Sequence, residues 1–219
     1  MGLYSHNANY TGYKKNHAER EALDYYSTPT EEVENILDTI NINLNHTIVL
    51  EPCAGGGHML VGIENYCNKN NFKTTIIASD VKDRGNIATT EIFSGDEFDF
   101  LTEKYPFKNT IDYIIMNPPY ATIEPFTLKA LEIANHGVLL LGRLQFAEGE
   151  ARYDTIFKEC PPTDIYVYVD RIACYKNGNV KEKQASAQAY AWFYWDRYYM
   201  QENEYPTKFH WIRRANKIK

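Results

Sequence analysis

The residues best equipped for chemistry are the four from Asn117 to Tyr120, an asparagine followed by two prolines and a tyrosine. They directly follow residues 111–116, an apolar run that predicts a buried strand. Two prolines after an asparagine form a stiff turn that continues neither a helix nor a central strand. Such a turn fixes the Asn117 amide, leaves backbone carbonyls without a strand partner and holds an aromatic ring nearby. These parts suit the binding of a planar group with an exposed NH2, although an ordinary proline loop has the same sequence.

A second group is the glycine-rich stretch Gly55-Gly56-Gly57, which follows the strand predicted at 47–50. Glycines let the backbone turn tightly and approach a ligand closely. The helix predicted from His58 directs its N-terminus at this loop, which favours an anionic group such as a carboxylate. The stretch lacks the Gly-Lys-Ser/Thr of a P-loop, and the third glycine of the dinucleotide fingerprint would fall at Leu60. A ligand with a carboxylate, a ribose and no phosphate fits better.

An acid stands where the ribose of such a ligand would be held. The strand-like residues 74–78 are followed by Ser79 and Asp80. In dinucleotide folds an acid beyond the second strand binds ribose hydroxyls. A lone aspartate after a strand is commonly a turn residue, but its position here favours the ribose contact.

Alternating strand and helix patterns predict the framework for these residues. A Ser/Thr cap, an early proline and acids at 27–32 mark a helix start. Strands are predicted at 47–50, 74–78, 111–116 and 138–141, and further helices at 58–66 and 123–135. Runs that are apolar on both faces indicate strands between helix layers, hence a mostly parallel α/β sheet. Residues 165–169 and 189–195 predict an antiparallel hairpin at its C-terminal edge.

Taken in order, these elements resemble the motifs of S-adenosylmethionine-dependent DNA adenine-N6 methyltransferases. The motifs are Glu51-Pro52-x-x-Gly55-x-Gly57, Asp80, Asp99-Phe100-Leu101 and Asn117-Pro118-Pro119-Tyr120. Tyr25-Tyr26-Ser27-Thr28-Pro29 resembles the extra cofactor motif that precedes the glycine loop in such enzymes. The resemblance covers about residues 20–145, and residues 143–146 with 189–195 resemble small phage-type members. It implies a Rossmann-like methyltransferase sheet and S-adenosylmethionine as the cofactor.

The resemblance also implies a role for each matched residue. Cofactor contacts are expected from the glycine loop and the segments beside it, namely Tyr26, Thr28, Pro29, Glu51, Cys53, Ala54, Gly55 and Gly57. Asp80 would bind the cofactor ribose and Asp99 its adenine amine, with Phe100 against that ring. Asp96 competes with Asp99 for the amine. Cys53 and Gly56 stand where relatives often have Ser and Asp.

The expected chemistry explains the proline turn. An exocyclic amine is a poor nucleophile because its lone pair is delocalised into the ring. The Asn117 side-chain oxygen and the Pro118 carbonyl can both accept hydrogen bonds from that NH2, which localises the lone pair toward the methyl group. Positioning and electrostatics then supply most of the acceleration. Tyr120 would stack on the base, which in duplex DNA is first flipped out.

Three parts of the chain are expected: an arm at 1–26, a methyltransferase domain at 27–200 and a basic tail at 201–219. Residues 170–187 form a long basic segment, a candidate recognition insertion. The formal net charge of −6 argues against non-specific coating of nucleic acid but allows a local basic face. No separate recognition domain is evident, so a partner chain or homodimer is expected to help specificity.

The sequence shows no pattern typical of a metal site, a signal peptide or a membrane span. Its four cysteines show no CxxC pair and no zinc-site spacing, so no metal is expected. No signal peptide opens the chain and no apolar run is long enough to span a bilayer. Free thiols are simplest in a reducing cytoplasm.

The amine-bearing substrate is left open by the motif itself. Release-factor methyltransferases carry the same four residues and methylate a protein glutamine, which also presents an NH2. They usually have a helical domain before the glycine loop, whereas one polar arm and one helix precede it here. The motif also allows RNA adenine or cytosine-N4 methylation, and a catalytically silent relative that only binds nucleic acid.

Overall fold

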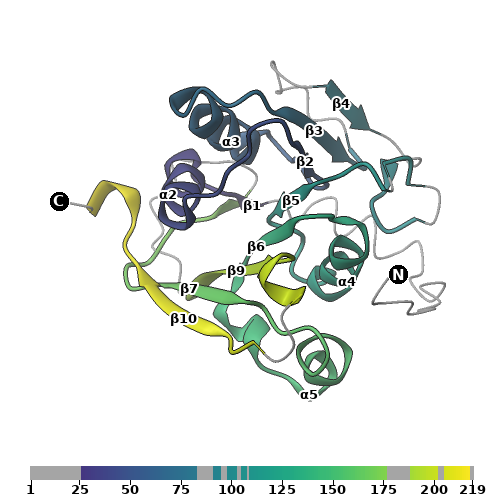
Figure 1. The fold of residues 1–219 in the computed structure, drawn as a ribbon. Helices are drawn as coiled ribbons and strands as arrows, with labels where there is room; N and C mark the ends of the chain where they lie inside the picture. The colour runs from purple at the N-terminus through teal and green to yellow at the C-terminus, as the bar shows by residue number, and fades with distance from the viewer. Residues whose placement is uncertain are drawn as a thin grey trace.

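A computed structural model describes residues 26–82, 91–94, 98–102, 105–107, 109–176, 188–201 and 205–217. Its centre is an eight-stranded sheet in the order β10-β7-β9-β6-β5-β2-β3-β4 (Figure 1). The strands are β2 Ile48–Glu51, β3 Thr75–Asp80, β4 Glu91–Ser94, β5 Tyr113–Met116, β6 Gly137–Arg143, β7 Asp164–Tyr168, β9 Tyr190–Asp196 and β10 Lys208–Ile212. Because β9 runs antiparallel to both β6 and β7, β7 and β10 point the same way as the parallel strands.

Helices cover the sheet on both faces. The longer ones are α2 Thr30–Ile40, α3 His58–Lys69 and α4 Ile123–Ile133. Shorter helical segments are η2 Leu144–Ala147, α5 Glu150–Arg152, η3 Tyr153–Phe157, η4 Tyr199–Gln201 and η5 Ala215–Lys217. Residues of α2 and α3 share one apolar cluster with the sheet, whereas α4 and η3 share another cluster on the opposite face. The outcome is the three-layer arrangement expected for a sheet whose strands are apolar on both faces.

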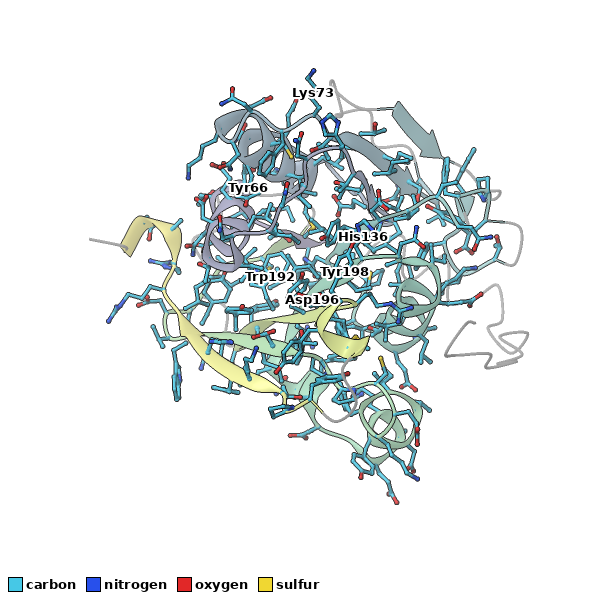
Figure 2. The ribbon with its side chains drawn as sticks, viewed as in Figure 1. Tyr66, Lys73, His136, Trp192, Asp196 and Tyr198 are labelled. Carbon is cyan, nitrogen blue, oxygen red and sulfur yellow. The ribbon has the colours of Figure 1, made fainter. Side chains whose placement is uncertain are left out.

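The largest side chains of the core come from β9. Trp192, labelled in Figure 2, and Trp195 are both fully buried. Neighbouring side chains point to opposite faces of a strand, and Trp192 accordingly joins the α2–α3 cluster while Phe193 and Trp195 join the α4 cluster. Each indole N–H has a partner, since Trp192 donates to the Tyr168 hydroxyl and Trp195 to the Cys160 carbonyl. Pairing of this kind removes the cost of burying a polar group.

The predicted fold class is confirmed, with one addition at the edge. The expected antiparallel pair is β7 and β9, but β9 lies inside the sheet, between β6 and β7. Residues 208–212 were expected within a basic tail, yet they form β10, which pairs in parallel with β7. The pattern of these residues, an alternation of apolar and polar side chains, was masked by the basic residues around them.

Part of the expected insertion at 170–187 pairs with the segment before the first helix. β8, Tyr175–Lys176, lies antiparallel to β1, Tyr26–Ser27, in a separate two-stranded sheet. The N-terminal arm at 1–25 and residues 177–187 lie outside the described part of the chain. The insertion therefore contributes backbone support to the segment that carries Thr28 and Pro29.

Candidate active site

The glycine loop crosses the carboxyl ends of β2 and β3. Gly55 and Gly57 have φ angles of 55° and 79°, which residues with a Cβ rarely adopt. Two backbone hydrogen bonds hold the turn, from Ala54 N–H to the Ser79 carbonyl at 3.1 Å and from Gly57 N–H to the Ala54 carbonyl at 2.8 Å. Gly57 precedes α3, so the loop delivers the helix N-terminus to the site.

Asp80 lies at the end of β3 and binds the glycine loop directly. Its Oδ2 accepts the Gly55 N–H at 2.8 Å, and its Oδ1 accepts the Lys82 N–H at 2.9 Å. The carboxylate is buried. The expected contact of Asp80 with a ribose hydroxyl stays a prediction.

Glu51 ends β2 beside the loop and is buried. Its Oε2 has no hydrogen-bond partner among the described residues. Burial raises the pKa of Glu51 well above its usual range, and the nearby charge of Asp80 raises it further. A buried carboxyl group with an unpaired oxygen can bind a donor or a cation brought by a ligand.

Asn117 follows β5 and has its amide orientation fixed by the segment before α2. Its Nδ2 donates to the Tyr26 carbonyl at 3.1 Å and to Thr28 Oγ1 at 3.0 Å. A carbonyl only accepts hydrogen bonds, so the NH2 of the side chain must face Tyr26. The Oδ1 of Asn117 is buried and has no partner among the described residues. The proline turn therefore presents an unsatisfied acceptor oxygen, in addition to Glu51 Oε2.

Aromatic and basic side chains surround Tyr120. The Arg143 guanidinium carbon is 4.1 Å from the centre of the Tyr120 ring. The Tyr26 ring centre lies 5.2 Å away, and the Tyr120 hydroxyl is 2.8 Å from that of Tyr190. Burial, chiefly, raises the pKa of Tyr120, so the phenol stays neutral. The expected stacking of Tyr120 on a base would have to share its ring with these neighbours.

Arg143 and Tyr190 were not expected around the proline turn. They occupy paired positions of β6 and β9, which are 47 residues apart in the chain (190 − 143 = 47). Burial raises the pKa of the nearby Cys174 thiol to about 12, although a hydrogen bond with Tyr190 acts to lower this pKa. Only the register of two strands brings these groups together, and no spacing in the sequence reports it.

The expected pocket for the cofactor adenine is less open than the motif implied. Phe100 is 1% exposed and packs against Tyr105 and Phe126, with ring centres 5.2 and 5.1 Å away. The Asp99 Oδ1 accepts the Leu101 N–H at 2.9 Å, a bond typical of an aspartate turn. Asp96 lies outside the described residues, so the choice between the two aspartates stays open.

The remaining expected site residues lie around the same edge of the sheet. Thr28 is buried, Pro29 accepts the Glu32 N–H of α2, and Cys53 is half-buried beside the glycine loop. Ala54 packs with Leu60 and Ala78. Pro118 is buried, while the Pro119 carbonyl accepts the Thr122 N–H at 3.0 Å and so leads the chain into α4.

Two other site classes find no support in the described part of the chain. No group of three or more His, Cys, Asp or Glu side chains there could hold a metal ion. No helix there has the length and apolar character needed to cross a membrane.

Comparison with known proteins supports the fold. No family model and no curated protein matches the chain. Among solved structures, the methyltransferase subunit of a type I restriction-modification system from Streptococcus thermophilus has a TM-score of 0.60 at 11% identity, over 90% of this chain and 48% of that one. The modification subunit of a candidate type I restriction enzyme from Vibrio vulnificus has a TM-score of 0.58 at 13% identity, over 86% and 47%.

A third structure is similar over most of both chains. A candidate RNA methyltransferase from Pyrococcus horikoshii has a TM-score of 0.55 at 18% identity, over 80% of this chain and 88% of that one. The present chain spans about half the length of the two restriction-enzyme subunits. These likenesses establish a Rossmann-like methyltransferase fold.

Proposed function

We propose that the chain transfers a methyl group from S-adenosylmethionine to the N6 amine of adenine in DNA. The observation that carries this proposal is the Asn117 side chain, whose NH2 is fixed by Tyr26 and Thr28 while its buried Oδ1 has no partner among the described residues. An unpaired buried acceptor costs free energy, about 1–3 kcal/mol. A substrate that donates an N–H to it recovers that cost, and an exocyclic amine is such a donor.

The surroundings of Asn117 favour a flat aromatic amine over a flexible amide. Tyr26 and Tyr190 each lie within stacking or hydrogen-bonding range of Tyr120, and Arg143 covers the Tyr120 ring. Aromatic and guanidinium planes are surfaces on which unstacked bases bind. A glutamine side chain has no ring to use them, so adenine is the better match.

The residues at the glycine loop fit S-adenosylmethionine. Gly55 and Gly57 keep the backbone free of side chains, and the N-terminus of α3 favours the carboxylate of the methionine part. The unpaired Glu51 Oε2 can accept a hydrogen bond from its ammonium group. The bound cofactor would supply a methyl group carried on a sulfonium sulfur. Once the methyl group is transferred, the rest of the cofactor is a neutral thioether.

The chain's own part in the reaction is to hold the amine. Asn117 Oδ1 and, by the motif, the Pro118 carbonyl would each accept a hydrogen bond from the N6 amine, which turns the nitrogen lone pair toward the methyl group. The nitrogen would bond to the methyl carbon as the carbon–sulfur bond breaks, and the methylated nitrogen would then release one proton to water. The stiff Pro118-Pro119 turn keeps both acceptors in place, so little reorganisation is needed during transfer. Recognition of a target sequence is assigned to a partner chain or second copy, as in systems whose methyltransferase is one subunit.

Side-by-side transfer of labelled methyl groups tests the proposal. The purified chain is incubated with labelled cofactor and, in separate reactions, DNA, RNA or a glutamine-containing release factor. Label in N6-methyladenosine from DNA supports the proposal. Label in protein, in RNA alone or in another nucleoside rejects it.

A further inference from the structure

The outermost strand, β10, exposes two large aromatic side chains. Phe209 is 51% exposed and Trp211 is 73% exposed, and their ring centres lie 5.3 Å apart in an edge-to-face arrangement. Trp211 is the most exposed large apolar side chain among the described residues. Aromatic side chains bury large areas and are among the strongest contributors to binding, so two adjacent exposed ones indicate a binding surface.

Strand register sets both rings on one face of the sheet. Phe209 is paired with Ile165 and Trp211 with Val167 on β7, and paired residues share a face. Ile165 and Val167 belong to the apolar cluster that α4 and η3 cover nearer the sheet centre. The cover stops short of β10, where the aromatic pair meets solvent. Figure 1 shows β10 running along the outer side of β7, at the margin of the molecule.

β10 ends at the same edge of the sheet as β5, and Trp211 is the residue before its last one. β10 points the same way as β5, because the one antiparallel strand, β9, lies between two strands of shared direction. The carboxyl end of β10 therefore meets the edge where Asn117 follows β5. Four strand spacings separate the two strands, roughly 19 Å at about 4.8 Å each. A short extended segment of a polymer chain can cover that distance.

Positive charge gathers where β10 ends. Arg213 and Arg214 follow directly, and the Arg214 Nη1 donates to the Arg171 carbonyl at 3.3 Å. Residues 205–217 carry four Lys or Arg and no acid, in a chain whose formal net charge is −6. Asp170 lies 3.7 Å from Arg213 and offsets part of this charge. Arginines beside aromatic rings are the usual means of binding phosphates and unpaired bases together.

The surface is fixed to the body of the protein. The Asn35 amide of α2 donates to the Arg213 carbonyl at 2.7 Å, and the Ala215 N–H donates to the Glu32 carboxylate at 3.2 Å. Glu32 and Asn35 are both buried. A rigid platform loses little conformational entropy on binding.

We infer that Phe209, Trp211 and the arginines after β10 form a docking surface for single-stranded DNA that flanks the target base. The inference rests on the proposed function and adds the place where the polymer is held. Bases stack on the two rings, while Arg213 and Arg214 contact the phosphates between them and the active site.

Fluorescence anisotropy with a labelled single-stranded oligonucleotide tests it. Trp211→Ala should weaken binding about 5- to 100-fold, as expected for loss of one stacked base, whereas Trp211→Phe should retain most of the affinity. Tyr153→Ala is the matched control, since Tyr153 is 57% exposed and belongs to η3 and not to β10. Arg213→Gln should reduce the salt dependence by about one phosphate contact.

Equal affinity of wild type and Trp211→Ala would overturn the inference, as would tighter binding of RNA than of DNA. A wild-type dimer that Trp211→Ala dissociates, seen by sedimentation, would assign the surface to a second copy instead. Methyl transfer to DNA with unchanged binding by Trp211→Ala would defeat this inference alone. Trp211-dependent DNA binding without methyl transfer would defeat the proposed function alone.

Discussion

Thr28 Oγ1 accepts a hydrogen bond from Asn117 Nδ2 at 3.0 Å, across 89 residues of sequence. The bond joins the segment before the first long helix to the turn after β5. Together with the bond to the Tyr26 carbonyl, it uses both hydrogens of the amide. The Asn117 oxygen is thereby turned to the position where a substrate amine could meet it.

Replacing Thr28 should loosen that orientation without removing bulk. Thr28→Val keeps the shape and loses the acceptor, so we expect kcat to fall about five- to tenfold, the equivalent of one neutral hydrogen bond. Thr28→Ser keeps the hydroxyl and should stay within about twofold of wild type. Steady-state transfer kinetics measure both, and equal kcat values for Val and Ser variants would show that the bond does not orient Asn117.

The ring and the hydroxyl of Tyr120 should have different effects, the hydroxyl on stability and the ring on activity. The hydroxyl meets that of Tyr190, whereas the ring is expected to supply the stacking surface. Tyr120→Phe should therefore lower stability by about 1 kcal/mol and leave most activity. Tyr120→Ala should reduce kcat/KM by at least about tenfold. Tyr190→Phe is the comparison, because it removes the same hydrogen bond from the other side together with the hydrogen bond to Cys174, and it should also lose thermal stability.

Glu51 should make the protein without cofactor less stable as pH rises. Burial raises its pKa above 4.5 in the folded state, so its neutral form is favoured there. Its contribution to stability is full below about pH 4.5 and is lost as pH rises toward the folded pKa. Glu51→Gln stays neutral, and its melting temperature should exceed that of wild type by an amount that grows as the pH rises above about 4.5. A difference that stays constant as the pH rises would contradict the raised pKa.

The three loop glycines should tolerate substitution unequally. Gly55 and Gly57 have positive φ angles, so alanine at either costs about 1–2 kcal/mol of backbone strain. The strained loop should also bind cofactor at least about tenfold more weakly. Gly56 does not share the positive φ, and Gly56→Ala serves as the control. Calorimetric titration with S-adenosylhomocysteine measures the affinities, and the idea fails if all three variants bind alike.

Local patterns were sufficient to predict the strands and helices that hold the site. The cap and proline before α2, the apolar run of β5 and the glycines before α3 are all signals within a few residues. Asn117 and the glycine loop were brought into one expected site by their resemblance to methyltransferase motifs. The bond between Asp80 and the Gly55 N–H was not predicted, because an aspartate after a strand has the same sequence whether it holds a loop or a ligand.

Contacts between segments that are far apart in the chain depended on strand register, which sequence spacing does not encode. Arg143 reaches Tyr120 because β6 pairs with β5, and Tyr190 reaches it because β9 pairs with β6 across a long connection. β8 pairs with β1 through backbone bonds, which leave no side-chain pattern. β10 was hidden among basic residues, and its pairing with β7 places Trp211 on an exposed face.

The central claim is that the free oxygen of Asn117 holds the amine during methyl transfer. Its most direct test measures labelled N6-methyladenosine formed in DNA by wild type and by Asn117→Ala, with cofactor affinity measured for both. The account predicts product from wild type, a loss of at least about 100-fold in the variant and equal cofactor affinity. Undiminished N6-methyladenosine from Asn117→Ala would contradict it.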